Sequence, residues 1–156
     1  MAADRTHRTW AEIDLDAIAH NLREIRRHTD RTAQIMAVVK ADAYGHGAPQ
    51  VAREALAHGA SWLAVAMLEE AIELRRQDIK APILILSDNE PECAETVVAC
   101  DVRQAVSSYD MARRLSEAAG RLGKRARIHL KIDTGMGRIG FSPEQAPAEA
   151  ERIARL

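Results

Sequence analysis

The sequence lacks three features: a net charge, a long hydrophobic run and a framework of cysteines. Its 22 basic and 23 acidic side chains are interspersed and leave a formal net charge of −1. This balance gives no electrostatic footprint for nucleic acid or an anionic membrane. The N-terminal MAADRTHRTW has no apolar signal region, and no run approaches the roughly 20 apolar residues of a membrane span. We therefore expect a cytoplasmic protein whose partners are small molecules or protein, with no nucleic acid and no membrane among them.

The two cysteines, Cys93 and Cys100, lie seven residues apart in a stretch with helical periodicity. That spacing separates them by about two helical turns, which is too far for a disulfide. We expect buried, reduced thiols. The six histidines make no zinc-like spacing with these cysteines, so no metal site is predicted.

Short apolar runs alternate with amphipathic segments along the chain. Strands are expected at about 9–13, 35–39, 61–67, 82–86, 102–106 and 125–133, separated by helices at about 14–28, 49–58, 69–77, 93–100, 109–120 and from 143. The alternation with short connections predicts parallel strands joined by helical crossovers, so the fold class is α/β. Counting from Met36, five strands could belong to a (βα)₈ barrel, which takes about 250 residues. An open, doubly wound five-stranded sheet fits this chain length without further strands, so length alone favours that fold.

The stretch MAVVKADAYGHG, Met36 to Gly47, is the most informative. An apolar run ends abruptly in Lys40, just before a Tyr-Gly-His-Gly turn. An amine is thus placed at the carboxyl end of a strand, where barrels and open α/β sheets present their reactive groups. The alternative is a solvated lysine beside an ordinary glycine turn, which is the commoner situation for a lysine.

The second informative stretch is HLKIDTGMGRIGF, from His129 to Phe141. Its strand portion alternates, so that His129, Lys131 and Asp133 share one face. The following loop satisfies the dinucleotide pattern G-x-G-x-x-G. That fingerprint belongs in a first βα turn with an acidic partner about 20 residues later, whereas this loop comes late in the chain. A flexible turn with Arg138 as a surface cation is the other alternative.

Taken together, AVVKADAYGHG, KIDTGMGRIGF and the opening TWAEIDLDAIAHNL resemble the N-terminal part of the pyridoxal-phosphate-dependent alanine racemases in order and spacing. The resemblance covers essentially the whole chain but less than half of such an enzyme, which has a complete (βα)₈ barrel followed by a C-terminal β domain. It implies that residues 1–156 form an incomplete TIM-type barrel with about five parallel strands and crossover helices, preceded by a short N-terminal strand and helix. The later barrel strands and the β domain are absent from this stretch. The resemblance therefore reverses the preference for an open sheet.

The resemblance also assigns residues to a site. Lys40 matches the lysine that holds pyridoxal 5'-phosphate as a Schiff base and acts as one of two racemisation bases. Tyr44 matches a tyrosine that binds the cofactor phosphate. Arg138 matches an arginine that contacts the cofactor's phenolic oxygen and the substrate carboxylate. Lys131 matches a lysine, carbamylated in some members, that orients the arginine, and Leu86 matches a residue packed near the cofactor.

His46 and Asp133 belong to the same motifs, and we expect supporting roles for them. In the family the opposite base is a tyrosine from the partner subunit's C-terminal domain, and an arginine on a later barrel strand binds the pyridine nitrogen. Neither lies in this sequence.

The implied function is interconversion of L- and D-alanine by a homodimer that supplies D-alanine for cell-wall peptidoglycan. The isolated 156-residue chain is expected to be inactive. Two alternatives are a non-catalytic pyridoxal-phosphate carrier barrel and a nucleotide-binding or interaction α/β domain that uses the loop GMGRIG.

Overall fold

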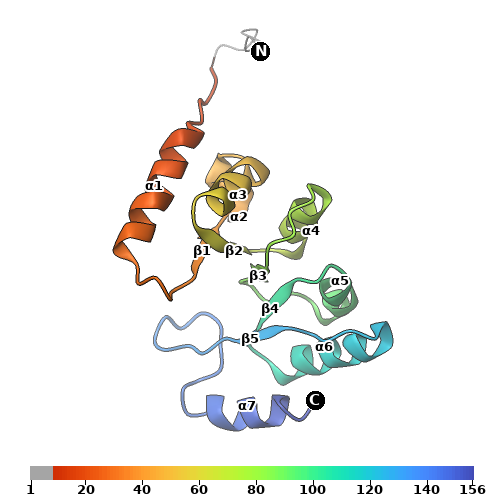
Figure 1. Ribbon diagram of the computed structural model, residues 1–156. Helices are drawn as coiled ribbons and strands as arrows, with labels where there is room; N and C mark the ends of the chain where they lie inside the picture. Colours follow the sequence, from red (N-terminus) through yellow and green to blue (C-terminus); the bar gives the residue numbers. More distant parts are fainter. Residues whose placement is uncertain (1–8) are drawn as a thin grey trace.

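Five parallel strands form a sheet in the computed structural model, which describes residues 9–156 (Figure 1). The strands are β1 (Ile35–Val38), β2 (Ala60–Val65), β3 (Ile83–Ile85), β4 (Arg103–Val106) and β5 (Ile128–Leu130). Their order across the sheet, β1-β2-β3-β4-β5, is also their order in the sequence. Each crossover therefore moves one strand further in the same direction, as in a barrel, whereas a doubly wound sheet reverses direction. The predicted α/β class and the barrel-type arrangement are confirmed.

Helices connect the strands and line one side of the sheet. They are α1 (Leu15–His28), α2 (Lys40–Gly45), α3 (Ala48–Ala57), α4 (Leu68–Arg76), the 3₁₀ turn η1 (Pro91–Cys93), α5 (Ala94–Ala99), α6 (Tyr109–Leu122) and α7 (Ala146–Ile153). Figure 1 shows α3, α4, α5 and α6 along one side of the strands. Side-chain N-caps form at two helix starts: Asp14 accepts a hydrogen bond from Ala17 N–H at 3.1 Å at α1, and Ser108 accepts one from Met111 N–H at 3.3 Å at α6.

The main core lies between the sheet and these helices. It contains strand residues such as Leu63, Ile83 and Val106, and helix residues such as Leu74 and Leu115, all at most 1% exposed. The opposite face, which we call the inner face, carries a small cluster: Ala64, Leu84 and Ala105, with Met36 and Leu86 packed against it. Because both faces of the central strands are covered or apolar, these strands appear in the sequence as continuous hydrophobic runs.

The strand predicted at 9–13 is wrong. Residues 9–14 have no regular secondary structure, and Trp10 is 69% exposed. A strand needs a neighbour to pair with its N–H and C=O groups, and none lies beside this segment within residues 9–156. The fifth strand is also shorter than predicted and continues only as a single bridge between Ile132 and Phe141.

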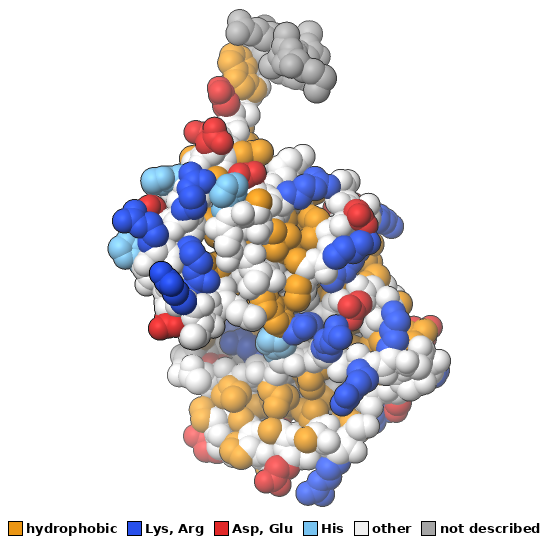
Figure 2. Space-filling model, viewed as in Figure 1, with side chains coloured by type: hydrophobic (Ala, Val, Ile, Leu, Met, Phe, Trp, Pro, Cys, Tyr) orange, Lys and Arg blue, Asp and Glu red, His pale blue; other side chains and the backbone are white. Residues whose placement is uncertain are grey.

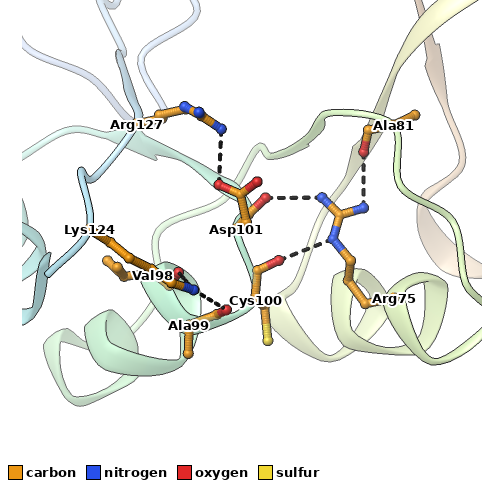
Figure 3. A network of polar contacts seen from close by, with 8 residues as sticks. All are labelled: Arg75, Ala81, Val98, Ala99, Cys100, Asp101, Lys124 and Arg127. Carbon is orange, nitrogen blue, oxygen red and sulfur yellow. Dashed lines mark hydrogen bonds and ion pairs between the residues drawn. The ribbon is translucent and has the colours of Figure 1, made fainter. Parts of the chain in front are cut away.

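A polar network fixes the turns that lead into β3, β4 and β5 (Figure 3). The guanidinium of Arg75 donates to four backbone carbonyls: Ile79 at 2.6 Å, Ala81 at 2.9 Å, Cys100 at 3.0 Å and Asp101 at 3.0 Å. Nearby, Lys124 donates to the Ala99 carbonyl at 2.9 Å, and Arg127 pairs with the Asp101 carboxylate at 2.9 Å. Burial lowers the pKa of Arg75, although a guanidinium stays charged. The network holds the amino ends of the strands in register.

Within the described residues, no helix is both long and apolar enough to cross a membrane. The same part of the chain contains no group of three His, Cys, Asp or Glu side chains suited to a metal ion. His7, one of the six histidines, lies outside the described residues. Cys93 and Cys100 are free thiols, and both are half-buried where the sequence predicted burial.

Candidate active site

Lys40 directly follows the buried end of β1. The preceding residue, Val39, is 1% exposed, and its N–H donates to the Ala64 carbonyl of β2 at 2.8 Å. Lys40 itself is half-buried. Because all five strands are parallel, their carboxyl ends meet at one edge of the sheet, and Lys40 lies at that edge as the sequence predicted.

The backbone after Lys40 is unusual. Four consecutive residues, Ala41, Asp42, Ala43 and Tyr44, have left-handed helical conformations with φ between 50° and 56°. This conformation costs an L-residue roughly 1–2 kcal/mol, so the turn stores about 4–8 kcal/mol that other contacts must offset. The sequence predicted a Tyr-Gly-His-Gly turn after Lys40, but the left-handed conformations begin at Ala41, before the glycines.

Asp42 ties this left-handed turn to the helix that follows. Its carbonyl accepts from Gly47 N–H at 2.9 Å, and its carboxylate accepts from Ala48 N–H at 2.6 Å at the start of α3. Ala43 is 5% exposed and donates its N–H to the Val39 carbonyl at 2.9 Å. The turn is thus anchored at both its strand end and its helix end.

Tyr44 lies beside Lys40. The Lys40 amine is 5.9 Å from the centroid of the Tyr44 ring, at the outer limit of a cation–π contact, and Tyr44 is 61% exposed. The Nδ1 atom of His46 is 2.9 Å from the Ala43 carbonyl and 3.2 Å from the Tyr44 carbonyl. His46 therefore contacts the backbone of the turn.

The glycine loop after β5 is organised by Asp133. Its Oδ1 atom accepts from Gly137 N–H and Gly135 N–H, each at 3.0 Å, and these hydrogen bonds lower the pKa of the carboxyl. The Asp133 N–H donates to the Phe141 carbonyl, and Phe141 N–H donates to the Lys131 carbonyl, both at 2.9 Å. Backbone hydrogen bonds thus close the base of the loop, and the Asp133 carboxylate binds two of its backbone N–H groups.

This geometry disfavours the dinucleotide hypothesis. In a phosphate-binding loop the glycine N–H groups point at the ligand, and a helix begins directly after the turn. Here two of the glycine N–H groups bind Asp133, and the next helix, α7, begins only at Ala146.

The predicted residues fall into separate groups along the carboxyl edge. Lys40 and Tyr44 follow β1, whereas Lys131 and Arg138 follow β5 at the other end of the sheet, and Arg138 is exposed. Four strand spacings of about 4.8 Å separate these ends by roughly 19 Å around the sheet. No hydrogen bond or ion pair joins the two groups within residues 9–156. Leu86 lies between them at the end of β3 and packs against the inner-face cluster.

Glu70 was not predicted as a site residue from the sequence. Its carboxylate accepts hydrogen bonds from Ala66 N–H at 2.7 Å, from Met67 N–H at 2.9 Å and from Ala41 N–H. An acidic residue in the first turn of α4 is a recognisable capping signal. The contact with Ala41 joins residues 29 positions apart, so no local sequence pattern predicts it.

A cationic and aromatic cluster on the inner face was also missed. The Arg103 guanidinium carbon lies 3.9 Å from the Trp62 ring centroid, and the His129 ring meets Trp62 edge-on at 5.8 Å. Burial and the charge of Arg103 lower the pKa of His129. Strand alternation could have placed these side chains on one face, but not in contact. Figure 2 shows hydrophobic and basic side chains beside a hollow in the middle of this view of the molecule.

Comparison with known proteins gives one family. The model of the alanine racemase N-terminal domain matches residues 13–156. An alanine racemase of Desulforamulus reducens is 51% identical over 148 residues, which are 94% of this chain and 40% of that protein. Among solved structures, an alanine racemase of Clostridium difficile 630 has a TM-score of 0.93 at 40% identity, over 97% of this chain and 40% of that one. A histidine racemase of Leuconostoc mesenteroides subsp. sake has a TM-score of 0.83 at 31% identity, over 92% of this chain and 38% of that one.

The chain spans about 40% of the length of the curated relatives it matches. The family model covers nearly all of this chain, and the solved alanine racemase has the same fold over the same residues. The chain therefore belongs to the alanine racemase N-terminal domain family.

Proposed function

We propose that this chain is the N-terminal, pyridoxal-phosphate-binding part of an amino-acid racemase that interconverts L- and D-alanine. In this proposal residues 1–156 are the first part of a barrel whose later strands, followed by a β domain, belong to the complete enzyme. The observation that carries it is Lys40, half-buried at the carboxyl end of β1 and followed by a left-handed turn that holds Tyr44 beside it. Membership of the family supports the reaction type.

The residues present suit pyridoxal phosphate. A lysine amine is the group that bonds covalently to an aldehyde, and Lys40 offers one at the edge where α/β active sites form. Tyr44 is exposed, and its hydroxyl is a donor for the phosphate. Leu86 and the apolar inner face next to it offer a wall for the aromatic ring. When bound, the cofactor supplies an electron sink that lets the substrate lose its Cα proton.

The residues of this chain then bind the substrate, move its proton and position the groups that do so. In this proposal the Lys40 amine takes the Cα proton on one face of the substrate, and Arg138 binds the substrate carboxylate through its planar guanidinium. Lys131 positions Arg138, while Asp133 shapes the loop that carries Arg138 and His46 braces the turn that carries Tyr44. The proton donor on the opposite face we assign to another part of the complete enzyme.

Trapping the cofactor on its lysine tests this proposal. We expect the chain mixed with pyridoxal phosphate to develop a visible absorption band, and borohydride reduction to attach the label to Lys40. Lys40→Ala should lose both signals, whereas Lys80→Ala, at an exposed lysine paired with Asp78, should keep them. A label absent from wild type, or shared equally among surface lysines, would contradict the proposal.

A racemisation assay separates an enzyme from a carrier. We expect the complete enzyme to interconvert the alanine enantiomers and the isolated chain to show little or no activity. Assays with serine and histidine define the substrate range, because a histidine racemase shares this fold. Cofactor binding by the complete protein without racemisation of any amino acid would instead favour the carrier hypothesis.

We further propose that the complete enzyme is a cytoplasmic homodimer that supplies D-alanine for peptidoglycan. Membership of the family supports these points. Sedimentation of the complete enzyme tests the dimer, and a D-alanine requirement after deletion of the gene tests the cellular role.

A further inference from the structure

Glu70 connects two segments that lie far apart in the sequence. One carboxylate oxygen, Oε2, accepts from Ala66 N–H at 2.7 Å and from Met67 N–H at 2.9 Å, where β2 leads into α4. The other oxygen, Oε1, accepts from Ala41 N–H, the residue directly after Lys40. A single side chain thus joins the carboxyl ends of β1 and β2.

The contact between Glu70 and Ala41 lies at the start of the left-handed turn. Ala41 is the first of the four left-handed residues, and its φ of 50° is unfavourable for any residue with a Cβ atom. The other turn contacts act on Asp42, Ala43 and Tyr44, further along the turn. Glu70 is therefore the side chain that holds the first strained residue and, through the shared peptide, the backbone of Lys40.

The chemistry of the contact suits a carboxylate and nothing else of the same size. All three partners are N–H donors, and an ionised carboxylate is an acceptor at both oxygens. No lysine or arginine pairs with Glu70 within residues 9–156, so these backbone groups are its hydrogen-bonding partners there. A glutamine at this position would turn an N–H₂ group toward at least one backbone N–H.

We propose that Glu70 is a positioning residue that holds the turn after β1 so that the Lys40 amine is directed at the cofactor site. This inference rests on the proposed function, because it assigns Lys40 the cofactor. Glu70 touches neither cofactor nor substrate in this scheme. It acts through the peptide between Lys40 and Ala41.

The first test measures the contact itself, without cofactor. Amide hydrogen exchange at Ala41 is expected to be slow in wild type and at least tenfold faster in Glu70→Gln. Glu69→Gln is the matched control, because Glu69 is exposed in the same turn of α4. Equal protection of Ala41 in all three proteins would overturn the inference, whatever the cofactor does.

The second test measures the consequence for Lys40. We expect Glu70→Gln to weaken pyridoxal-phosphate labelling of Lys40 about tenfold and to shift the pH dependence of the absorption band, with Glu69→Gln unchanged. A merely structural loss would not move that pH dependence. An unchanged affinity and pH profile in Glu70→Gln would overturn the inference. If wild type acquired no pyridoxal-phosphate label, the proposed function would be wrong. The hydrogen-exchange experiment would still decide whether Glu70 holds Ala41.

Two further variants separate the loss of the Ala41 contact from a general loss of folding. Glu70→Asp keeps the charge but is one methylene shorter, so we expect it to keep the α4 contacts and lose Ala41. Adding Ala41→Gly to Glu70→Gln relieves the strain, because glycine adopts positive φ freely. The double variant should recover most of the lost labelling, and a double variant as weak as Glu70→Gln would overturn the positioning role.

Discussion

Among the glycines of the loop after β5, Gly140 is the one at which an added Cβ atom would meet the backbone. Its φ is +129°, and a Cβ atom there would lie 2.6 Å from Asp133 N and 2.9 Å from Ile132 C. Side chains do not approach backbone atoms this closely, so the loop must shift to admit one. We expect Gly140→Ala to lower the free energy of unfolding by about 2 kcal/mol, measured by urea denaturation.

The matched control is Gly120→Ala. Gly120 lies inside α6, and an added Cβ meets no atom within 4 Å. Alanine is favoured over glycine in a helix by about 1 kcal/mol, so this variant should be slightly more stable than wild type. If both variants lost stability equally, the close approach at Gly140 would not be the cause.

His129 gives the protein a dependence on mildly acidic pH. Burial and the positive charge of Arg103 lower its pKa in the folded chain below the ordinary value of about 6.5. The unfolded chain therefore binds this proton more tightly than the folded one. The resulting stability is fully present above about pH 6.5 and is lost as the pH falls through the lowered folded pKa.

We therefore expect the thermal unfolding temperature to fall between pH 7.5 and pH 5.5, and His129→Gln to make this fall smaller. An identical pH dependence in wild type and His129→Gln would contradict the assignment.

Among the elements, helices and strands were predictable where the sequence pattern is local. Cap residues such as Asp14 and Ser108 and the apolar runs of β2 and β3 act over a few positions, and they fixed those boundaries. The left-handed turn after Lys40 was not predictable, because its strain is offset by Glu70, 29 residues away from the amide it binds. The strand predicted at 9–13 failed because a strand requires a partner that a local pattern does not reveal.

The turns between helices and strands depend on contacts of the same long-range kind. Arg75 leaves the last turn of α4 and binds carbonyls on both the turn before β3 and the turn before β4 (Figure 3). A lysine keeps the charge but cannot present five N–H donors in a plane. We expect Arg75→Lys to lower the free energy of unfolding by about 2–3 kcal/mol, since hydrogen bonds from charged groups contribute about 1.5–3 kcal/mol.

Guanidinium denaturation measures this loss, with Arg76→Lys as the control. Arg76 is the next residue of α4 and is exposed. Equal stability of Arg75→Lys and Arg76→Lys would mean that the carbonyl contacts add nothing to folding.

For the molecule as a whole, the order of the motifs predicted the fold better than the hydrophobic pattern did. The hydrophobic pattern alone favoured an open doubly wound sheet, whereas the resemblance carried by the motifs around Lys40 and Arg138, which lie 98 residues apart, indicated the barrel family. The order of the strands in the sheet and the match to the family model agree with the barrel prediction. The contact between Trp62 on β2 and Arg103 on β4, and the burial of Gln104, could not be predicted, because they depend on how the strands of the sheet are aligned.

The ends of the sheet set how this chain behaves alone. Within residues 9–156, β1 pairs with β2 alone and β5 with β4 alone, so each end presents backbone groups without a strand partner. Apolar side chains are exposed nearby, with Val38 42% exposed on β1 and Ile132 39% exposed after β5. Unpaired strand edges beside apolar surface favour association between chains.

We therefore expect the isolated chain to self-associate as its concentration rises, and Val38→Lys to reduce this association, because a lysine at an edge strand disfavours pairing with another strand. Light scattering after size-exclusion chromatography over a concentration series measures the effect. Thr96→Lys adds the same charge on the exposed side of α5, away from both ends of the sheet, and should associate like wild type. If both lysine variants reduced association equally, net charge rather than the free edge of β1 would control it.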